Sequence, residues 1–247
     1  MPAFRPRRVD PSITAGLGRG LGIHPVTAQV LAGRGIDTAE RARAFLHPDA
    51  SQLHDPERLD DMDAATEAVD RAIGAGRRIA VYGDYDVDGV CGTALLVRAL
   101  DFLGARTTPF IPHRVRDGYG LSATALEGLR REGCSLVVTV DNGTTRPDEI
   151  AQSQERGLDV VVTDHHEPGP RLPACPLVNP KRPGSRYPFS GLAGCGVALK
   201  LAMGLARRRG LWGDPGLGRL WPEMMALAAL GTVADGVPLV DENRSLV

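Results

Sequence analysis

Residues 79–89 read Ile79-Ala80-Val81-Tyr82-Gly83-Asp84-Tyr85-Asp86-Val87-Asp88-Gly89, and this stretch decides the fold of the 247-residue chain. Its apolar beginning is typical of a short buried parallel strand, and a cluster of carboxylates follows directly. Two later apolar runs, residues 136–140 and 160–163, end in the same way, in Asp141-Asn142-Gly143 and Asp164-His165-His166. Because the parallel strands of an open sheet end at one crevice, we expect the three polar clusters to converge there.

Helical and strand patterns alternate around these three runs. We predict a helix before the first strand, a further strand after it, and helices between the strands. The helices are expected at residues 62–75, 92–103, 122–131, 147–156, 196–208 and 221–232, and the further strand at residues 107–111. The alternation predicts an α/β fold with a mainly parallel, doubly wound sheet, while the proline-rich residues 168–190 are expected to wrap around its surface.

The chain is predicted to divide into a short helical N-terminal leader, residues 1–56, and a larger domain, residues 57–247. The two helices of the leader are expected at residues 25–33 and 38–46. The glycine-rich residues 16–20 and 191–196 lack the strand-to-helix context of a nucleotide-binding glycine motif. We therefore interpret both glycine-rich stretches as loops.

Composition limits the class of protein. Hydrophobic residues make up 43% of the chain and charged residues 24%, which is typical of a globular protein. No apolar stretch is long enough to span a bilayer, and residues 1–8 lack the apolar stretch of a secretory signal, so we expect a cytoplasmic location without a membrane partner. The four cysteines have no paired spacing, which favours reduced, mostly buried thiols over a disulfide framework or a zinc ribbon.

The net charge of −1 provides no overall basic footprint for a nucleic acid, which weakens the case for a polynucleotide substrate. A local basic patch or a further domain could still supply a positive groove. We interpret Arg207-Arg208-Arg209 as the end of a helix, where cations complement the helix dipole, rather than as a phosphate contact.

Three carboxylates, Asp84, Asp86 and Asp88, stand within five residues and repel one another unless a cation neutralises them. Their alternation predicts that they share one side of an extended turn, and Gly89 allows the backbone to approach a ligand closely. The alternatives are a solvated acidic turn and an EF-hand calcium loop. The calcium loop is disfavoured because the stretch follows a strand and lacks the later acidic ligand of that loop.

The doublet His165-His166 beside Asp164 strengthens the metal interpretation, since imidazole suits manganese, iron or zinc. Asp141 alone would be an ordinary turn residue, but its place after a buried strand raises its weight. Asp235 follows an apolar helix and by itself could simply end that helix. Together the clusters predict a divalent-metal site that activates water.

Seven segments in order along the chain carry a family resemblance. They are residues 83–89, 110–114, 117–120, 140–143, 163–166, 178–181 and 230–235. In these motifs the chain resembles the DHH phosphoesterase superfamily and, within it, the RecJ single-strand-specific DNA exonucleases. So many motifs in order make the superfamily assignment specific, and the resemblance identifies residues 57–247 as a DHH catalytic domain.

The resemblance implies a two-metal site, usually with Mn²⁺ or Mg²⁺. The residues that it implies as ligands are Asp86, Asp88, Asp141, His165 and Asp235, with Asp141 suited to bridging the ions. It also implies Asp84 and His166 as catalytic residues. Asp84 would be an extra ligand, and His166 would contact the scissile phosphate or assist the attacking water.

Such a site suits phosphodiester hydrolysis, because paired cations activate water and neutralise the attacking and leaving oxygens. The family implies release of mononucleotides from single-stranded DNA in the 5′ to 3′ direction, in DNA repair and recombination, with a single-strand-binding protein and a helicase as candidate partners. Arg114 and Tyr119 are candidates for holding phosphate or stacking a base, and Asn142 for binding substrate. A loop salt bridge for Arg114 and a buried ring for Tyr119 are equally good interpretations of the sequence alone.

The chain departs from the family pattern in two places. Tyr82 stands where some members of the superfamily carry a metal-binding histidine, so one metal position lacks an expected ligand. RecJ-like proteins continue past the position of Val247 into a second domain with a Gly-Gly-His-type motif and an oligonucleotide-binding fold. We therefore expect both domains to be absent, and the chain to be either a truncated fragment or a catalytic core that binds metal yet cleaves DNA poorly.

Two other kinds of function remain open at this point. The same clusters could serve a phosphodiesterase of short oligonucleotides or cyclic dinucleotides, or an inorganic pyrophosphatase, and a small substrate would fit the absence of a basic groove. A non-catalytic scaffold of a replication complex would carry a degenerate site. The intact carboxylates and both histidines disfavour the scaffold.

Overall fold

The computed structural model of the chain describes residues 7–115 and 120–247, which form two compact units, Met1–Leu53 and His54–Val247. The first unit is helical. Its helices are α1 (Pro11–Leu21), α2 (Pro25–Gly33) and α3 (Ala39–Leu46), followed by a short 3-10 helix, Ala50–Gln52. The two helices that the sequence predicted here, α2 and α3, are confirmed.

The prediction of a loop at residues 16–20 is wrong, because these residues lie inside α1. Asp10 caps the helix by accepting a hydrogen bond from the backbone N–H of Ser12, and Pro11 occupies the first turn. Leu17 is buried in a small apolar core together with Ala28 and Leu31. Burial of this apolar face outweighs the low helix propensity of the glycines.

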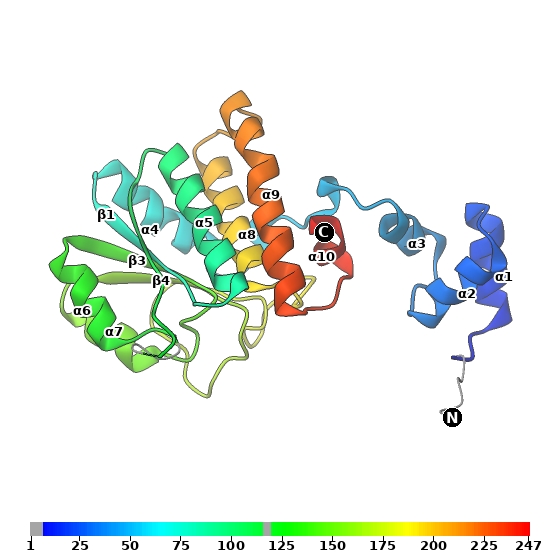
Figure 1. The fold of residues 1–247 in the computed structure, drawn as a ribbon, viewed down its shortest axis with the longest axis horizontal. Helices are drawn as coiled ribbons and strands as arrows, with labels where there is room; N and C mark the ends of the chain where they lie inside the picture. The colour runs from blue at the N-terminus through cyan, green and yellow to red at the C-terminus, as the bar shows by residue number, and fades with distance from the viewer. Residues whose placement is uncertain (1–6, 116–119) are drawn as a thin grey trace. The chain divides into compact units, whose positions relative to one another are not determined.

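The second unit is an α/β domain that alternates helices and strands (Figure 1). Its strands are β1 (Arg78–Tyr82), β2 (Arg106–Phe110), β3 (Cys134–Val140), β4 (Asp159–Thr163) and β5 (Leu177–Val178). Its helices are the 3-10 helix Pro56–Arg58, α4 (Met62–Gly74), α5 (Val87–Phe102), α6 (Ala123–Arg131), α7 (Pro147–Glu155), α8 (Gly194–Arg208), α9 (Pro215–Asp235) and α10 (Asp241–Leu246).

All the strand pairings in this domain are parallel, in the order β2-β1-β3-β4-β5, which confirms the predicted parallel α/β sheet. Helices α6 and α7 cover one face of the sheet, and α4, α5 and α8 cover the other, with α9 packed on α5 and α8 (Figure 1). The chain leaves β1 toward β2 on one side and later returns to β3 on the other. The strand order therefore reverses between β1 and β3, which is where open α/β sheets bind ligands.

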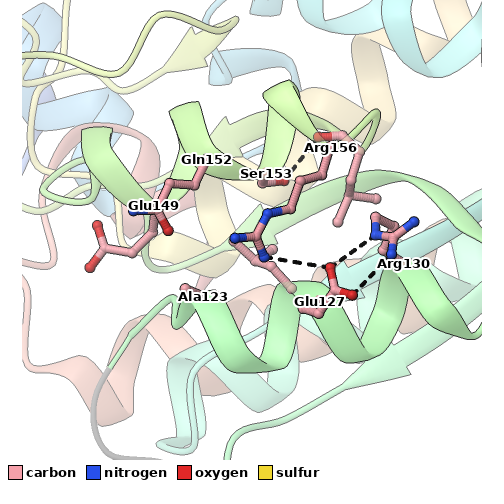
Figure 2. Close-up of a pocket in the computed structure, with 9 residues that line it drawn as sticks. Ala123, Glu127, Arg130, Glu149, Gln152, Ser153 and Arg156 are labelled. Atoms are coloured by element: carbon pink, nitrogen blue, oxygen red, sulfur yellow. Dashed lines mark hydrogen bonds and ion pairs between the residues drawn. The ribbon is translucent and has the colours of Figure 1, made fainter.

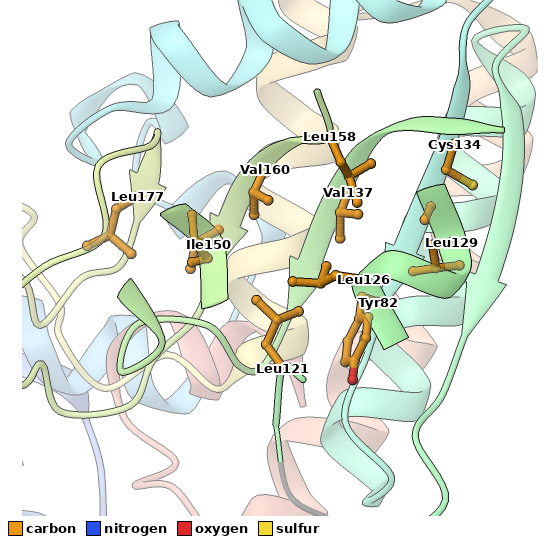
Figure 3. Close-up of a cluster of buried hydrophobic side chains, with 12 residues drawn as sticks. Tyr82, Leu121, Leu126, Leu129, Cys134, Val137, Ile150, Leu158, Val160 and Leu177 are labelled. Atoms are coloured by element: carbon orange, nitrogen blue, oxygen red, sulfur yellow. The ribbon is translucent and has the colours of Figure 1, made fainter. Parts of the chain in front are cut away.

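The core under α6 and α7 consists of close-packed apolar side chains (Figure 3). Val137 and Val160 of the sheet meet Leu126 of α6 and Ile150 of α7 there. Tyr82, which is fully buried, belongs to the same cluster, so its ring points into this core. This layer fixes β3 and β4, and with them the polar residues that follow each strand.

The starts of two helices differ from the prediction, and one strand was not predicted. Helix α5 begins at Val87 rather than near residue 92, because the Asp86 side chain accepts a hydrogen bond from the N–H of Gly89 and caps the helix. Helix α9 begins at Pro215 rather than at residue 221, because Asp214 caps the helix at that earlier position. Strand β5 lies inside the proline-rich stretch and has only two residues, too few for a periodic pattern.

The prediction of a loop at residues 191–196 is partly wrong, since α8 already begins at Gly194. Helix α10 also had no sequence prediction. The arginine triplet after residue 206 does mark the end of a helix, because α8 ends at Arg208. These arginines pair with aspartates Asp55, Asp63 and Asp70. The four cysteines are free thiols, and Cys91, Cys134 and Cys195 are buried.

Helices α6 and α7 are joined by an ion-pair cluster centred on Glu127 (Figure 2). Arg130 and Arg131 donate to its carboxylate and lower its pKa to about 2, and Arg156 lies near the same carboxylate. A small pocket beside this cluster contains none of the predicted site residues. Within the described parts of the chain, no helix is long and apolar enough to cross a membrane.

A buried ion pair ties α10 to the domain. Lys200 of α8 contacts the carboxylate of Glu242 in α10, and both side chains are almost completely buried. Lys200 Nζ also donates to the carbonyl of His54 at 2.6 Å, and Tyr187 donates its hydroxyl to Glu242 at 2.5 Å. Every charge in this group therefore has hydrogen-bond partners, as burial requires.

We expect Lys200→Met to lower the free energy of unfolding by about 3–5 kcal/mol, because it leaves the Glu242 carboxylate buried without its cation. Urea denaturation would measure the change. Lys181→Met is the matched control, since the partner of Lys181, Glu167, has a side chain that is 81% exposed. The control should change the stability by less than about 1 kcal/mol. Equal losses of unfolding free energy in the two variants would contradict the stabilising role of the buried Lys200–Glu242 ion pair.

Candidate metal centre

The loop after β1 is closed so tightly that only glycine fits at its end. A Cβ atom on Gly89 would lie 2.5 Å from the backbone nitrogen of Asp84. Asp84 and Asp88 are buried, while Asp86 is exposed at the start of α5. The motif is thus a tight turn leading into the first turn of a helix, and not the extended turn that its alternation had predicted.

Asp141 follows β3 at the neighbouring strand end, in the left-handed backbone region with φ of +64°. Non-glycine residues adopt this conformation only where the surroundings hold them, and functional sites are enriched in it. Its N–H donates to the carbonyl of Thr163 at 3.0 Å, and its carboxylate packs against Gly194, where a Cβ atom would lie 2.5 Å from the Asp141 Cβ. The position of the carboxylate is therefore set from both sides.

Asp164 has a role that the sequence interpretation missed. Its Oδ1 accepts hydrogen bonds from the N–H groups of His165 and His166 and lies 2.8 Å from Nδ1 of His166. Its Oδ2 accepts from the N–H of Thr144 at 2.9 Å. Asp164 therefore orients His166 and is not among the groups of side chains that could share an ion. In the sequence, only the position of Asp164 beside the two histidines could have indicated this orienting role.

The predicted metal residues come together at the carboxyl edge of the sheet. Nε2 of His165 lies 3.0 Å from Asp141 Oδ1, 3.7 Å from Asp88 Oδ2 and 3.9 Å from Asp235 Oδ2. Three overlapping groups each have ligand atoms within 4.8 Å of one another. They are Asp84, Asp86 and Asp141; Asp88, His165 and Asp235; and Asp141, His165 and His166.

Asp88 is held by the first turn of α8. Its two carboxylate oxygens accept the N–H groups of Gly194 at 2.6 Å and of Cys195 at 2.9 Å. These are free N–H groups at a helix N-terminus, where the helix dipole also favours a negative charge. Gly231 of α9 packs against the same carboxylate, since a Cβ atom there would lie 2.9 Å from Asp88 Oδ1.

Burial and mutual repulsion disfavour the charged forms of several of these acids. Burial, together with the charges of Asp88 and Asp86, raises the pKa of Asp141 to about 10, and burial raises the pKa of Asp84 and of Asp235. Asp164 behaves in the opposite way. Burial opposes its charge, but hydrogen bonds and charge from His166, and hydrogen bonds from Thr144, outweigh burial and lower its pKa.

The side chains present fit a divalent cation. Asp141 Oδ1 is buried and close to His165 Nε2, yet it has no hydrogen-bond partner, and Nδ1 of His165 is likewise buried without one. These carboxylate and imidazole groups lie close together without hydrogen bonding to one another. Ligands around a shared metal ion have the same arrangement. Oxygen donors with one or two imidazoles suit Mg²⁺ or Mn²⁺.

The remaining predicted residues lie around this cluster. Asn142 is buried and donates its amide to the carbonyls of Tyr82 and Val140. Together with Arg146 and His166 it lines a cavity of about 350 Å³ beside the cluster. Arg114 is exposed, whereas Tyr119 lies outside the described residues.

Tyr82 does not face the metal cluster. Its ring contacts that of Phe110, with the centroids 4.8 Å apart and the ring planes tilted by 36°, and its hydroxyl donates to the carbonyl of Gly120. The position that the family resemblance compared with a metal-binding histidine therefore contributes to the core here. Asp84 instead joins Asp86 and Asp141 at that side of the cluster.

Comparison with known proteins agrees with this geometry. The chain belongs to the DHH family, because the model of the DHH family N-terminal domain matches residues 78–232. It is 44% identical, over 96% of its length, to the single-stranded-DNA-specific exonuclease RecJ of Bacillus subtilis. The chain spans 29% of that relative.

Solved structures show the same fold. RecJ from Thermus thermophilus in complex with Mn²⁺ superposes with a TM-score of 0.78 at 34% identity, over 97% of this chain and 33% of that one. The complex of the same enzyme with Mg²⁺ superposes with a TM-score of 0.67 at 30% identity, over 98% of this chain and 30% of that one. The family resemblance predicted from the motifs is confirmed.

We expect Gly194→Ala to weaken Mn²⁺ binding at least about tenfold while the domain stays folded, because the new methyl group would displace the Asp141 carboxylate. Isothermal titration calorimetry would measure the affinity, and circular dichroism the fold. Gly128→Ala in α6 is the matched control, since a Cβ atom there meets nothing within 4 Å. Unchanged Mn²⁺ affinity in Gly194→Ala would show that this contact does not position Asp141.

We also expect Mn²⁺ binding to release protons. The pKa of Asp141 without a metal is raised to about 10, so this group holds its proton at pH 7 and must lose it to bind a cation. The affinity should therefore rise with pH from 6 to 8, by up to about tenfold per unit for one released proton. Calorimetry in two buffers of different ionisation enthalpy would count the protons. A binding enthalpy independent of the buffer would contradict this expectation.

Proposed function

We propose that this chain is the catalytic core of a metal-dependent exonuclease that hydrolyses single-stranded DNA from its 5′ end. The observation that carries the proposal is the convergence of Asp84, Asp86, Asp88, Asp141, His165, His166 and Asp235 at one edge of the sheet. The similarity to the single-stranded-DNA-specific exonuclease RecJ supports the substrate. The 5′ to 3′ direction is what the family resemblance implies. In this proposal residues 57–247 are the catalytic domain, and residues 1–56 are a leader.

The proposal assigns two ions, Mn²⁺ or Mg²⁺, to this cluster. One ion would be held by Asp86 and Asp141 with Asp84 as an extra ligand, and the other by Asp88, His165 and Asp235, with Asp141 shared. When bound, the two ions supply an activated water and neutralise charge on the attacking and leaving oxygens. RecJ structures with Mn²⁺ and with Mg²⁺ support this choice of metals.

His166 is proposed to contact the scissile phosphate. The carboxylate of Asp164 holds its Nδ1 and raises its pKa, which leaves Nε2 to donate a proton or a hydrogen bond. Its side chain is 41% exposed, unlike the buried His165, so it can reach a substrate. The two histidines thus have different proposed roles, one as a ligand and one as a donor.

Arg114 and Asn142 are proposed to bind the DNA near the cluster. Arg114 presents an exposed guanidinium, and this group matches the geometry of phosphate oxygens. Tyr119 stays a sequence prediction. A cytoplasmic location, a role in DNA repair and recombination, and a single-strand-binding protein and a helicase as partners also stay predictions.

A phosphodiesterase for short oligonucleotides or cyclic dinucleotides is the second candidate. The net charge of −1 favours it, because a long single strand needs a positive groove to hold its backbone. Release of nucleotides from 5′-labelled and 3′-labelled DNA, with Mn²⁺ and with chelator, beside a dinucleotide substrate, distinguishes the two. Attack from the 5′ end of the long strand supports the exonuclease, and cleavage of the dinucleotide alone supports the second candidate.

We expect Asp141→Asn to reduce Mn²⁺-dependent hydrolysis by at least about 10³-fold, since it removes the charge shared by both proposed ions. Asparagine tolerates the left-handed backbone of this position, so the fold should persist. Asp148→Asn in α7 is the control, because the side chain of Asp148 is 71% exposed and pairs only at the surface with Arg171. Full activity of Asp141→Asn would remove the two-metal proposal.

A further inference from the structure

Tyr85 is the aromatic residue between the carboxylates of the first motif, and its backbone is fixed on both sides. Its N–H donates to Asp84 Oδ1 at 2.7 Å. The next residue, Asp86, caps α5, and Gly89 packs against the backbone of Asp84. The half-buried ring of Tyr85 is therefore carried by the same rigid turn that carries the proposed metal ligands.

Arg114 lies over this ring, although it is far away in the sequence. The centre of its guanidinium is 5.1 Å from the ring centroid, within the range of a cation–π interaction. The contact follows from the sheet, because β1 and β2 are paired in register with Tyr82 opposite Phe110. The segments that leave these two strand ends are consequently neighbours.

Stacking on Tyr85 keeps a cation beside the acidic cluster without using up a carboxylate. Among the described residues, Arg114 lies over the Tyr85 ring and makes no ion pair with Asp84 or Asp86. Such an ion pair would compete with a metal for the carboxylate oxygens. A guanidinium held over a ring by a cation–π contact can still donate its N–H groups to a phosphate. The ring contact thus restricts the rotamers of an exposed arginine and keeps its positive charge beside Asp84 and Asp86.

We propose that Tyr85 is a positioning residue, which acts through Arg114 by holding its guanidinium beside the metal cluster to receive a backbone phosphate of the substrate. This inference rests on the proposed function of the site. It differs from a direct role for Tyr85, in which the ring would stack a base, and from a packing role, in which it would only support the turn around Asp84 and Asp86.

A double-mutant cycle with Tyr85→Leu and Arg114→Ala separates these roles. Both variants and their combination would be assayed for the KM and kcat of Mn²⁺-dependent hydrolysis of 5′-phosphorylated single-stranded DNA. Binding of the same DNA in chelator would be measured by fluorescence anisotropy. Tyr85→Leu should raise KM and Kd about three- to fivefold with kcat unchanged, and it should have no further effect once Arg114 is alanine. Tyr85→Phe, which keeps the ring, should retain wild-type values.

A second measurement reports on the stack itself. The Nε–Hε resonance of Arg114 in an NMR spectrum should be shifted upfield by the ring current in the wild type and in Tyr85→Phe. The shift should disappear in Tyr85→Leu. If the resonance is the same in all three proteins, the stack is absent and the proposal is overturned.

Two results of the cycle would also overturn the proposal. If Tyr85→Leu raises the Kd for DNA by the same factor in the Arg114→Ala background as in the wild type, the ring contacts DNA directly. If it lowers kcat or Mn²⁺ affinity with KM unchanged, the ring supports the metal turn instead. A wild type that binds DNA but does not hydrolyse it would contradict the proposed function, while the anisotropy cycle and the NMR shift would still decide the role of Tyr85.

Discussion

The constraint on which the structure depends is that several carboxylates are buried close together at one edge of the sheet. Asp84, Asp88 and Asp141 are each about 99% buried, where unpaired charges are strongly disfavoured. The fold meets part of this demand itself, since the first turn of α8 donates two N–H groups to Asp88. The remaining buried negative charge is neutralised either by protonation of Asp141 or by a divalent cation. Metal binding and protonation therefore compete for the Asp141 carboxylate.

The sheet topology explains why these residues meet. Asp84 follows β1 and Asp141 follows β3, and the strand order reverses between these two strands. Close contacts that only glycine permits, at Gly89 and Gly194, then bring backbone and carboxylate together. Residues that carry no proposed metal or substrate contact, such as Asp164, complete the arrangement by orienting the side chains that do.

The sequence predicted the central strands, most helices and the α/β class correctly, because apolar runs and helical periodicity are local signals. It failed where local propensity and tertiary burial disagree. The glycines of α1 resemble a loop, yet Leu17 gains enough burial to keep them helical. Strand β5 exists only because its two residues pair with β4. The beginning of α5 was missed because Asp86 acts as a cap inside a motif that also resembles a turn.

By itself, the sequence determined the residue types of the site and the strand ends that carry them, since carboxylates and imidazoles after apolar runs are visible without a structure. Only the tertiary structure decided how they meet. Asp235 lies near His165 because α9 packs on α5 and α8, Tyr82 turns into the core, and Arg114 reaches Tyr85 across paired strands. These contacts join residues far apart in the chain, so they depend on packing and register, which local sequence patterns do not encode.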